Sequence, residues 1–269
     1  MGRFKLAHLS DLHFGKIGHP GIVDALVDEV NQGNVDLVAI SGDLTQRARD
    51  QEFAAASAML DAIRPPTLVV PGNHDVYPWW KPFHRVFDPL APYRRYISTE
   101  TAPTFEVDGV SVLGLNSAYG RTIKGGRIGS DAREALSNYF AGRDASVFKI
   151  VVVHHHLSRI EALGSHDIVR NATDTLNRAA NLGVDLILCG HLHVSHIEPV
   201  DVIPAEHRLV IASAGTATSS RGRGPNRETN FYNVVSVGSD DFSIEERRFD
   251  TALERFVTDL ETRFERAFE

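Results

Sequence analysis

The sequence is poor in cysteine and has no long run of hydrophobic residues. Cys189 is the single cysteine among 269 residues, which excludes an internal disulfide and a thiolate-rich structural zinc site. Its neighbours in LILCG are apolar, so we predict a small buried side chain at this position. No apolar run approaches the roughly 20 residues that a membrane-spanning helix needs, and we therefore predict no membrane span.

Positive charge is also scarce, with 28 Lys and Arg against 35 Asp and Glu and a formal net charge of -7. Because Lys and Arg supply the affinity for nucleic-acid phosphates, stable binding of nucleic acid is not expected. The opening MGRFKLAHLSDLH starts a strand pattern at Phe4, so we expect no signal peptide. Leu6 stands where a myristoylation signal has Ser or Thr. We expect a cytoplasmic protein with one domain over residues 1–269.

Short β-branched runs alternate with segments of helical periodicity, which predicts a layered α/β fold. The runs that predict strands are 4–10, 35–41, 67–72, 110–116, 148–154 and 184–190. Helical periodicity covers 21–31, 50–63, 130–140 and 172–182. Further strand-like runs at 207–214, 231–237 and 242–249 follow without helices between them. We therefore predict mixed rather than purely parallel sheets.

The last segment, 251–268, has apolar residues on one helical face among charged residues. These residues are Leu253, Phe256, Leu260, Phe264 and Phe268. We predict a C-terminal helix that docks on the sheet, with a dimerisation arm and hence a homodimer as the alternative.

Five of the predicted strands end directly in residues that bind metal ions. The motifs are Asp11-Leu12-His13, Gly42-Asp43, Gly72-Asn73-His74-Asp75, His154-His155-His156 and Gly190-His191-Leu192-His193. Each motif alone is weak, because Gly-Asp is common in turns and a lone His is more often a structural residue. Open α/β sheets place their sites at the carboxyl ends of strands, so the five motifs together predict one metal site.

This set, D-x-H, G-D, G-N-H-D, H and G-H-x-H, resembles the calcineurin-like metallophosphoesterase superfamily, and most closely its bacterial class III phosphodiesterases. The resemblance implies a four-layer αββα sandwich of two mixed sheets flanked by helices. It also implies one metal ion on Asp11, His13 and His193, a second on Asn73, His154 and His191, and Asp43 bridging both. In this superfamily a hydroxide shared by the two ions attacks phosphorus, and Mn, Fe, Zn or Co suits imidazole and carboxylate ligands.

The resemblance gives His74 the role of a catalytic residue that protonates the departing oxygen. Asp75 would orient His74 and raise its basicity; the alternative is a residue that stabilises the turn. In the histidine triplet we favour His154 as the ligand because it ends the strand, and His155 remains the alternative. If His155 is not a ligand, it is a candidate for the substrate cavity.

Other segments are candidates for substrate binding. Residues 76–98 interleave aromatic and basic side chains directly after His74 and predict a substrate lid, with an ordinary amphipathic helix and loop as the alternative. Arg221 and Arg223 in the loop 216–227 would suit phosphate oxygens. Asn116 at the end of its strand would face the site or stabilise a turn.

The function predicted from these features is hydrolysis of a phosphodiester, either a cyclic nucleotide or a glycerophosphodiester. Phospholipase C-like activity on a phospholipid and phosphomonoesterase activity are the alternatives on the same site. A serine/threonine protein phosphatase would carry G-D-x-x-D-R-G and R-G-N-H-E, whereas Gln46, Pro71 and Asp75 depart from these motifs. A non-enzymatic scaffold is disfavoured because every ligand position is filled.

Overall fold

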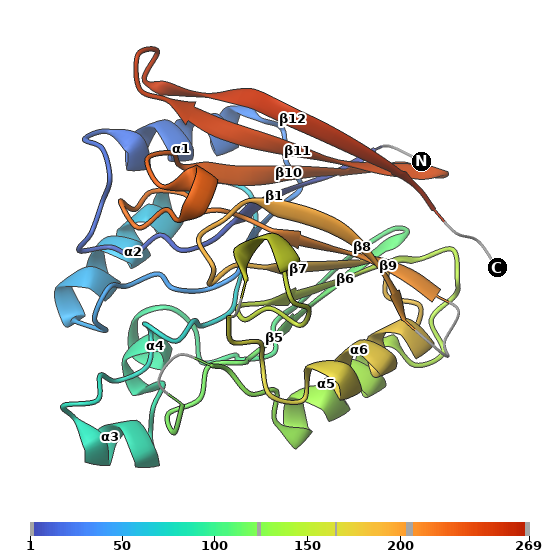
Figure 1. The fold of residues 1–269 in the computed structure, drawn as a ribbon, viewed down its shortest axis with the longest axis horizontal. Helices are drawn as coiled ribbons and strands as arrows, with labels where there is room; N and C mark the ends of the chain where they lie inside the picture. The colour runs from blue at the N-terminus through green and yellow to red at the C-terminus, as the bar shows by residue number, and fades with distance from the viewer. Residues whose placement is uncertain (1–2, 123–124, 165, 203–206, 267–269) are drawn as a thin grey trace.

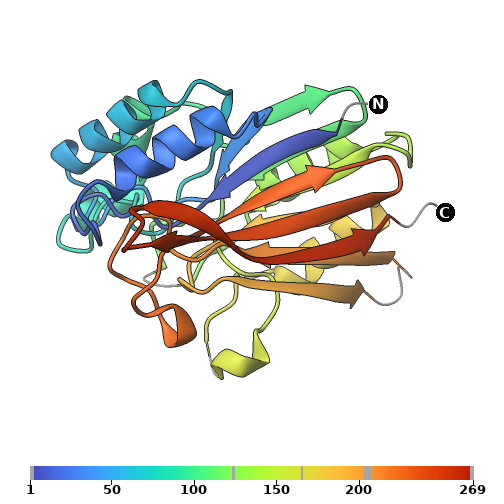
Figure 2. The same ribbon diagram turned by 90° about the horizontal axis from the view of Figure 1, so that it is seen from above.

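The computed structural model describes residues 3–122, 125–164, 166–202 and 207–266, which form two six-stranded mixed sheets (Figure 1, Figure 2). The strands of the first sheet are β1 (Phe4–Leu9), β2 (Leu37–Ile40), β3 (Thr67–Val69), β10 (Phe231–Val237), β11 (Asp241–Asp250) and β12 (Arg255–Glu265). Their order is β12-β11-β10-β1-β2-β3. β1, β2 and β3 run parallel, and β10 to β12 extend the sheet in antiparallel fashion.

The second sheet has a parallel centre and antiparallel edges. Its strands are β4 (Thr104–Val107), β5 (Val110–Leu115), β6 (Phe148–Val153), β7 (Leu186–Cys189), β8 (His196–Val202) and β9 (His207–Ser213). Their order is β4-β5-β6-β7-β9-β8, in which only β4 and β8 pair antiparallel with their neighbours.

Helices cover the outer face of each sheet. Their bounds are α1 (Ile22–Gln32), α2 (Asp50–Ala62), α3 (Pro82–Phe87), α4 (Ala91–Tyr96), α5 (Ser130–Phe140) and α6 (Ala172–Asn181). α1, α2 and α4 pack on the first sheet, and α5 and α6 pack on the second, on the opposite side of the molecule (Figure 1). The predicted four-layer αββα architecture is confirmed.

The alternation of side chains along β1 shows how the sequence builds these layers. Phe4 and Leu6 point into the core between the two sheets, whereas Ala7 and Leu9 point into the core beneath the helices. Successive side chains of a strand face opposite sides of its sheet, so a strand that is apolar on both faces must lie between two layers. β2 follows the same rule, which explains its uninterrupted apolar sequence.

The C-terminal helix predicted at 251–268 is wrong over the described residues. β12 occupies this segment and pairs antiparallel with β11, with Phe256 opposite Phe249 and Phe264 opposite Phe242. The apolar spacing suits one side of a helix, but in β12 a register shift between Glu246 and Arg247 of the partner strand puts Phe256 and Phe264 on opposite faces of the sheet. Pairing with β11 decides between the two structures. Phe268 lies outside the described residues.

Two edge strands, β4 and β8, were not predicted from the sequence. Both carry charged residues and β8 contains Pro199, which is typical of edge strands.

Over the part of the chain that the structure describes, no helix is both long and apolar enough to cross a membrane.

Candidate metal centre

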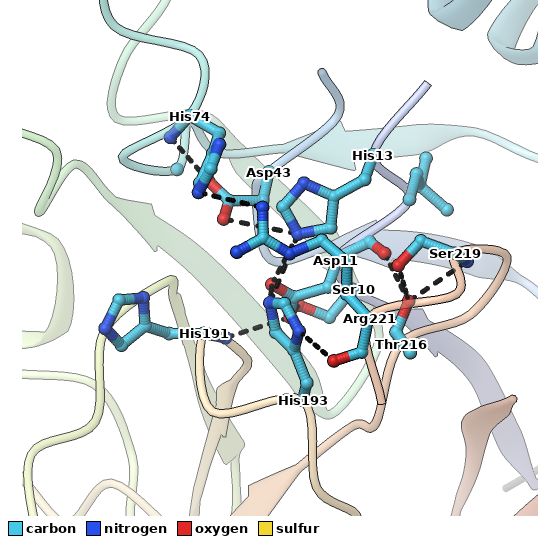
Figure 3. Close-up of polar contacts among 12 residues, drawn as sticks. Ser10, Asp11, His13, Asp43, His74, His191, His193, Thr216, Ser219 and Arg221 are labelled. Carbon is cyan, nitrogen blue, oxygen red and sulfur yellow. Dashed lines mark hydrogen bonds and ion pairs between the residues drawn. The ribbon is translucent and has the colours of Figure 1, made fainter. Parts of the chain in front are cut away.

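The loops after β1, β2, β3, β6 and β7 bring the predicted metal ligands together at one end of the two sheets. The first sheet supplies Asp11, His13, Asp43 and Asn73, and the second supplies His154, His191 and His193. A hydrogen bond from His154 Nδ1 to the carbonyl of Ser41, 2.7 Å long, joins the two groups of loops. Figure 3 shows Asp11, His13, Asp43 and His193 of this set lying close together.

The first cluster consists of Asp11, His13, Asp43 and His193, all buried. His193 Nε2 lies 3.1 Å from Asp11 Oδ1, and His13 Nε2 lies 3.5 Å from Asp11 Oδ1 and 3.6 Å from Asp43 Oδ2. Ligand atoms about 2.0–2.1 Å from one ion are separated by roughly 3.0–3.4 Å in octahedral or tetrahedral arrangements. The observed spacing therefore fits a shared cation.

Hydrogen bonds fix the two imidazole rings so that their Nε2 atoms face the centre of this cluster. His13 Nδ1 lies 3.2 Å from the carbonyl of Thr45, and His193 Nδ1 lies 2.8 Å from the carbonyl of Arg221. Because a carbonyl only accepts, each Nδ1 carries the hydrogen and each Nε2 presents a lone pair. These two Nε2 atoms are 3.2 Å apart, an arrangement that a cation between them would stabilise.

Asp43 connects this cluster to a second one. Its Oδ2 faces His13, while its Oδ1 lies 3.4 Å from His154 Nε2. His154 Nε2 is also 3.2 Å from Asn73 Oδ1. One ring nitrogen from each of His154, His155 and His191 lies within 4.8 Å of the other two. The two oxygens of one carboxylate therefore face two separate groups of metal-binding atoms.

The carboxylates of this centre keep buried oxygens for which no hydrogen bond is formed by the residues described. These atoms are Asp11 Oδ1 and Asp43 Oδ2, and an unpaired buried carboxylate oxygen is costly unless a cation neutralises it. The other oxygens are held firmly, since Asp11 Oδ2 accepts from Ser10 Oγ (2.7 Å) and from the amide of His191 (2.9 Å). The residues present thus fit a pair of metal ions.

The electrostatics of the site favour ionised carboxylates and a cation. Burial opposes ionisation of Asp43, but His154 and His74 hold the pKa of its carboxyl well below the usual range. Burial also opposes a charge on His154, yet Asp43 raises the pKa of His154 to about 9. Burial lowers the pKa of His13 to about 4, which leaves a neutral imidazole of the kind that binds metal.

The backbone at this centre adopts an uncommon conformation. Five of the candidate ligands have a positive φ: Asp11 (52°), His13 (47°), Asp43 (54°), His191 (70°) and His193 (59°). Asp and His enter the left-handed region more readily than most residues, and such strain concentrates at functional sites. The sharp turns after the strands aim these side chains at one point.

Two glycines permit the close approach of the loops. A Cβ at Gly72 would lie 2.1 Å from Asp43 Oδ1, and a Cβ at Gly190 would lie 1.8 Å from Ser10 Oγ. Both distances are far below van der Waals contact, so no larger residue fits without moving a carboxylate ligand or its hydrogen-bond partner.

A family model for calcineurin-like phosphoesterases matches residues 4–195, which include every candidate ligand. The chain belongs to this family. The resemblance carried by the sequence motifs is therefore confirmed, and the candidate metal centre lies within the matched segment.

Relatives of this phosphoesterase include proteins named as phosphodiesterases. The glycerophosphodiester phosphodiesterase GpdQ of Enterobacter lignolyticus is 38% identical over 26% of this chain and 29% of its own length. The 3',5'-cyclic adenosine monophosphate phosphodiesterase CpdA of Haemophilus influenzae is 25% identical over 62% of this chain and 59% of its own length. The chain thus spans less than two thirds of these relatives.

Solved structures support the fold of this phosphoesterase. A dimetal phosphatase from Danio rerio matches with a TM-score of 0.68 at 11% identity over 98% of this chain and 99% of that chain. A purple acid phosphatase from yellow lupin seeds matches with a TM-score of 0.75 at 12% identity, over 99% of this chain and 54% of that chain. At these identities the likeness establishes the fold alone.

His74 lies beside the centre, and its orientation corrects one prediction. His74 Nδ1 donates to the carbonyl of Gln46 at 2.7 Å, so this carbonyl rather than Asp75 orients the ring. Asp75 is buried and accepts from the amides of Leu44, Thr45 and Gly72. The turn-stabilising alternative for Asp75 is the one that the structure supports, because its carboxylate is occupied by the backbone of two ligand loops.

The arginines predicted from the loop 216–227 reach the site, whereas Asn116 does not. The guanidinium of Arg221 donates to Gln46 Oε1 (3.1 Å) and to His74 Nε2 (3.3 Å) (Figure 3), and Arg223 lines the same cavity. Asn116 Oδ1 accepts from the amide of Ala118 at 2.9 Å, which is a local turn contact. The predicted substrate contact at Asn116 is therefore corrected.

His155 is buried beneath the centre rather than exposed to the cavity. Its Nδ1 lies 2.8 Å from Ser117 Oγ, and its ring centroid lies 4.6 Å from that of His191. Gly126 packs against this ring so closely that a Cβ there would lie 2.3 Å from His155 Nδ1. The prediction that His155 contacts substrate is therefore corrected: His155 belongs to the second cluster, with His154 and His191.

The centre opens into a cavity of about 570 Å³. Of the predicted lid 76–98, the residues that line it are Val76, Pro78, Trp79, Trp80 and Arg85. The sequence did not single out Gln46, Arg47, His166 and Asp167 as cavity residues, although they also line it. Gln46 and Arg47 lie three and four residues after Asp43 of the G-D motif, and this closeness could have indicated that they line the cavity. No feature of the sequence indicated His166 and Asp167.

Proposed function

We propose that this chain is a dinuclear metal-dependent phosphodiesterase that cleaves a small phosphodiester, such as a cyclic nucleotide or a glycerophosphodiester. The position of Asp43 carries the proposal. Its Oδ2 lies 3.6 Å from His13 Nε2 and its Oδ1 lies 3.4 Å from His154 Nε2, which is the arrangement needed for one carboxylate to bridge two ions. Paired ions of this kind supply an activated water and neutralise phosphoryl oxygens.

We assign the ligands as the sequence predicted. Asp11, His13 and His193 would hold one ion, and Asn73, His154 and His191 the other. His154 is preferred over His155 because its Nε2 lies near both Asn73 Oδ1 and Asp43 Oδ1. Nitrogen and oxygen donors without thiolate suit Mn, Fe, Zn or Co.

His74 is proposed as the general acid. Its Nδ1 is committed to the Gln46 carbonyl, so a proton for the departing oxygen would come from Nε2, which is held near Arg221. Protonation of Nε2 would displace the Arg221 guanidinium, because both groups would then be donors. The released guanidinium would bind phosphoryl oxygens of the substrate.

A diester is favoured because the cavity has two kinds of wall. Arg47, Arg221 and Arg223 supply positive charge, while Trp79 and Trp80 offer apolar surface. In a phosphodiester the phosphoryl oxygens would face the arginines, and an organic group on phosphorus would face the tryptophans. Relatives named as phosphodiesterases agree with this choice.

The test is a comparison of bis(para-nitrophenyl) phosphate, cyclic AMP and glycerophosphocholine with para-nitrophenyl phosphate, together with the metal content of the protein. We expect about two metal ions per chain and a higher kcat/KM for a diester than for the monoester. The reverse ranking would favour the phosphomonoesterase alternative. A chain that binds no metal would favour a scaffold.

Two asparagines give a matched pair of variants. Asn73→Ala should lose metal and activity, whereas Asn116→Ala should keep both, since Asn116 Oδ1 accepts from the amide of Ala118 in a local turn. Equal losses in both variants would contradict the ligand assignment. A cytoplasmic location, a homodimer and the lack of nucleic-acid binding stay predictions.

A further inference from the structure

The segment beside the cavity exposes a group of large apolar side chains, which we call the α3 patch: Trp79, Trp80, Phe83, Val86 and Phe87. The exposed fractions are 71% for Trp79, 47% for Trp80, 76% for Phe83 and 82% for Phe87. α3 buries none of its six residues. Contiguous exposed apolar surface on a folded chain commonly marks an interaction site.

The α3 patch begins at the mouth of the cavity and includes a helix at the edge of the molecule. Trp79 and Trp80 line the cavity and contact each other, with ring centroids 5.9 Å apart. Phe83, Val86 and Phe87 have the spacing that places them on one side of a helix, and α3 lies at the periphery (Figure 1). Phe83 and Phe87 are outside the set of residues that line the cavity.

The segment that contains the α3 patch has a charge opposite to that of the whole chain. Residues 76–98 contain Lys81, Arg85, Arg94 and Arg95 against a single acid, Asp88, whereas the chain has a net charge of -7. Arg47 adds a further cation, 6.0 Å from the ring of Trp80. Arg94 pairs with Asp88, and the remaining cations leave this segment both aromatic and basic.

We propose that the α3 patch docks on a lipid bilayer that carries anionic headgroups. Trp at the headgroup level, Phe in the acyl boundary and Lys or Arg toward phosphate is the composition of interfacial membrane segments. A second copy of the chain fits less well, because pairing two such patches would bring like charges together. Docking would set the mouth of the cavity at the lipid surface, and it does not depend on the proposed chemistry.

Intrinsic fluorescence gives a direct test, because the only two tryptophans of the chain are Trp79 and Trp80. The protein is titrated with vesicles of phosphatidylcholine alone and with vesicles that also contain phosphatidylglycerol, and binding is checked by co-sedimentation. We expect a blue shift of emission and co-sedimentation with the anionic vesicles, both weakened by salt.

The double variant Phe83→Ser/Phe87→Ser should bind these vesicles about 100-fold more weakly. The matched control is Leu253→Ser/Leu260→Ser, which changes two residues that are each 55% exposed at the β11–β12 hairpin; it should bind like the unchanged protein.

Three results would overturn the proposal: no response to either vesicle, equal loss in both variants, or a dimer in light scattering that the Phe83→Ser/Phe87→Ser variant alone converts to monomer. The last would identify a self-association surface. Turnover of a soluble diester should be equal in the unchanged and Phe83→Ser/Phe87→Ser proteins. Vesicle binding without any diester turnover would refute the proposed function and leave the docking surface intact.

Discussion

Asp75 and Thr45 are joined by two hydrogen bonds, because Asp75 Oδ1 accepts from both the amide (2.9 Å) and the hydroxyl (3.0 Å) of Thr45. Asp75 Oδ2 accepts from the amides of Leu44 (3.2 Å) and Gly72 (2.9 Å). This carboxylate therefore ties the loop that carries Asp43 to the loop that carries Asn73.

Asp75→Asn should lower both stability and metal affinity, because an amide NH₂ would face backbone N–H groups that need an acceptor. We expect a loss of roughly 3 kcal/mol in the free energy of unfolding, measured by urea denaturation. Asp36→Asn is the control: Asp36 is exposed and accepts from the amide of Lys5, and the loss should stay within about 0.5 kcal/mol. A changed pH profile of activity with unchanged stability would instead restore the role of orienting His74.

Gly72→Ala should empty the metal centre, since the added Cβ would displace Asp43 Oδ1. Metal analysis after dialysis should show loss of bound metal, and activity should fall with it. At Gly129 a Cβ meets nothing within 4 Å, so Gly129→Ala should keep its metal and change stability by less than about 1 kcal/mol. Full metal content in Gly72→Ala would show that the loops move apart more easily than their hydrogen bonds indicate.

His74→Ala should reduce kcat by about 10²–10⁴-fold for a diester with a poor leaving group, with metal content unchanged. For bis(para-nitrophenyl) phosphate the reduction should be smaller, because this leaving group departs without a proton. Loss of metal in the variant, or an equal reduction for both substrates, would contradict the role of general acid.

Cys189 should resist thiol reagents in the folded protein. Burial raises the pKa of its thiol, so the reactive thiolate is scarce at neutral pH. Labelling with a disulfide reagent should be slow in buffer and fast in urea. Rapid labelling of the native protein would mean that β7 opens locally.

The β11–β12 hairpin should contribute stability that is lost in acid. Although burial opposes it, hydrogen bonds from Thr258 and Arg247 lower the pKa of Glu245. A carboxyl whose pKa is lowered on folding stabilises the protein above its unfolded pKa, and this contribution disappears as pH falls through the folded value. Glu245→Gln should therefore cost about 0.5–1 kcal/mol at neutral pH and nothing in acid, and denaturation at both pH values checks this. A loss that is equal at both pH values would assign the effect to packing.

The sequence predicted the central strands and the convergence of the candidate ligands because both depend on short local segments. A run such as FKIVVVH has the composition of a buried strand, and the residue that follows a parallel strand must lie at the site edge. The structure of β12 was not predictable, because the spacing of Phe256, Leu260 and Phe264 is that of one helix face. Only the pairing with β11 and its register shift place Phe256 and Phe264 on opposite faces of a strand.

The contacts of Asp75 and Asn116 were not predictable for a different reason. Each follows a strand near the site, so by sequence position alone both are equally good candidates for a residue of the site. Their partners are backbone amides, those of Leu44, Thr45 and Gly72 for Asp75 and that of Ala118 for Asn116. A side chain that binds backbone amides has no partner residue type by which the sequence could reveal the contact.

Asp43 belongs to the first sheet and His154 to the second, so the metal-binding atoms are divided between two layers that fold from different parts of the chain. Neither half holds a full set of donors. High-affinity binding of both ions must therefore come late in folding, after the layers have stacked, and it would then oppose their separation. The rate at which a refolding chain takes up metal would report that stacking step.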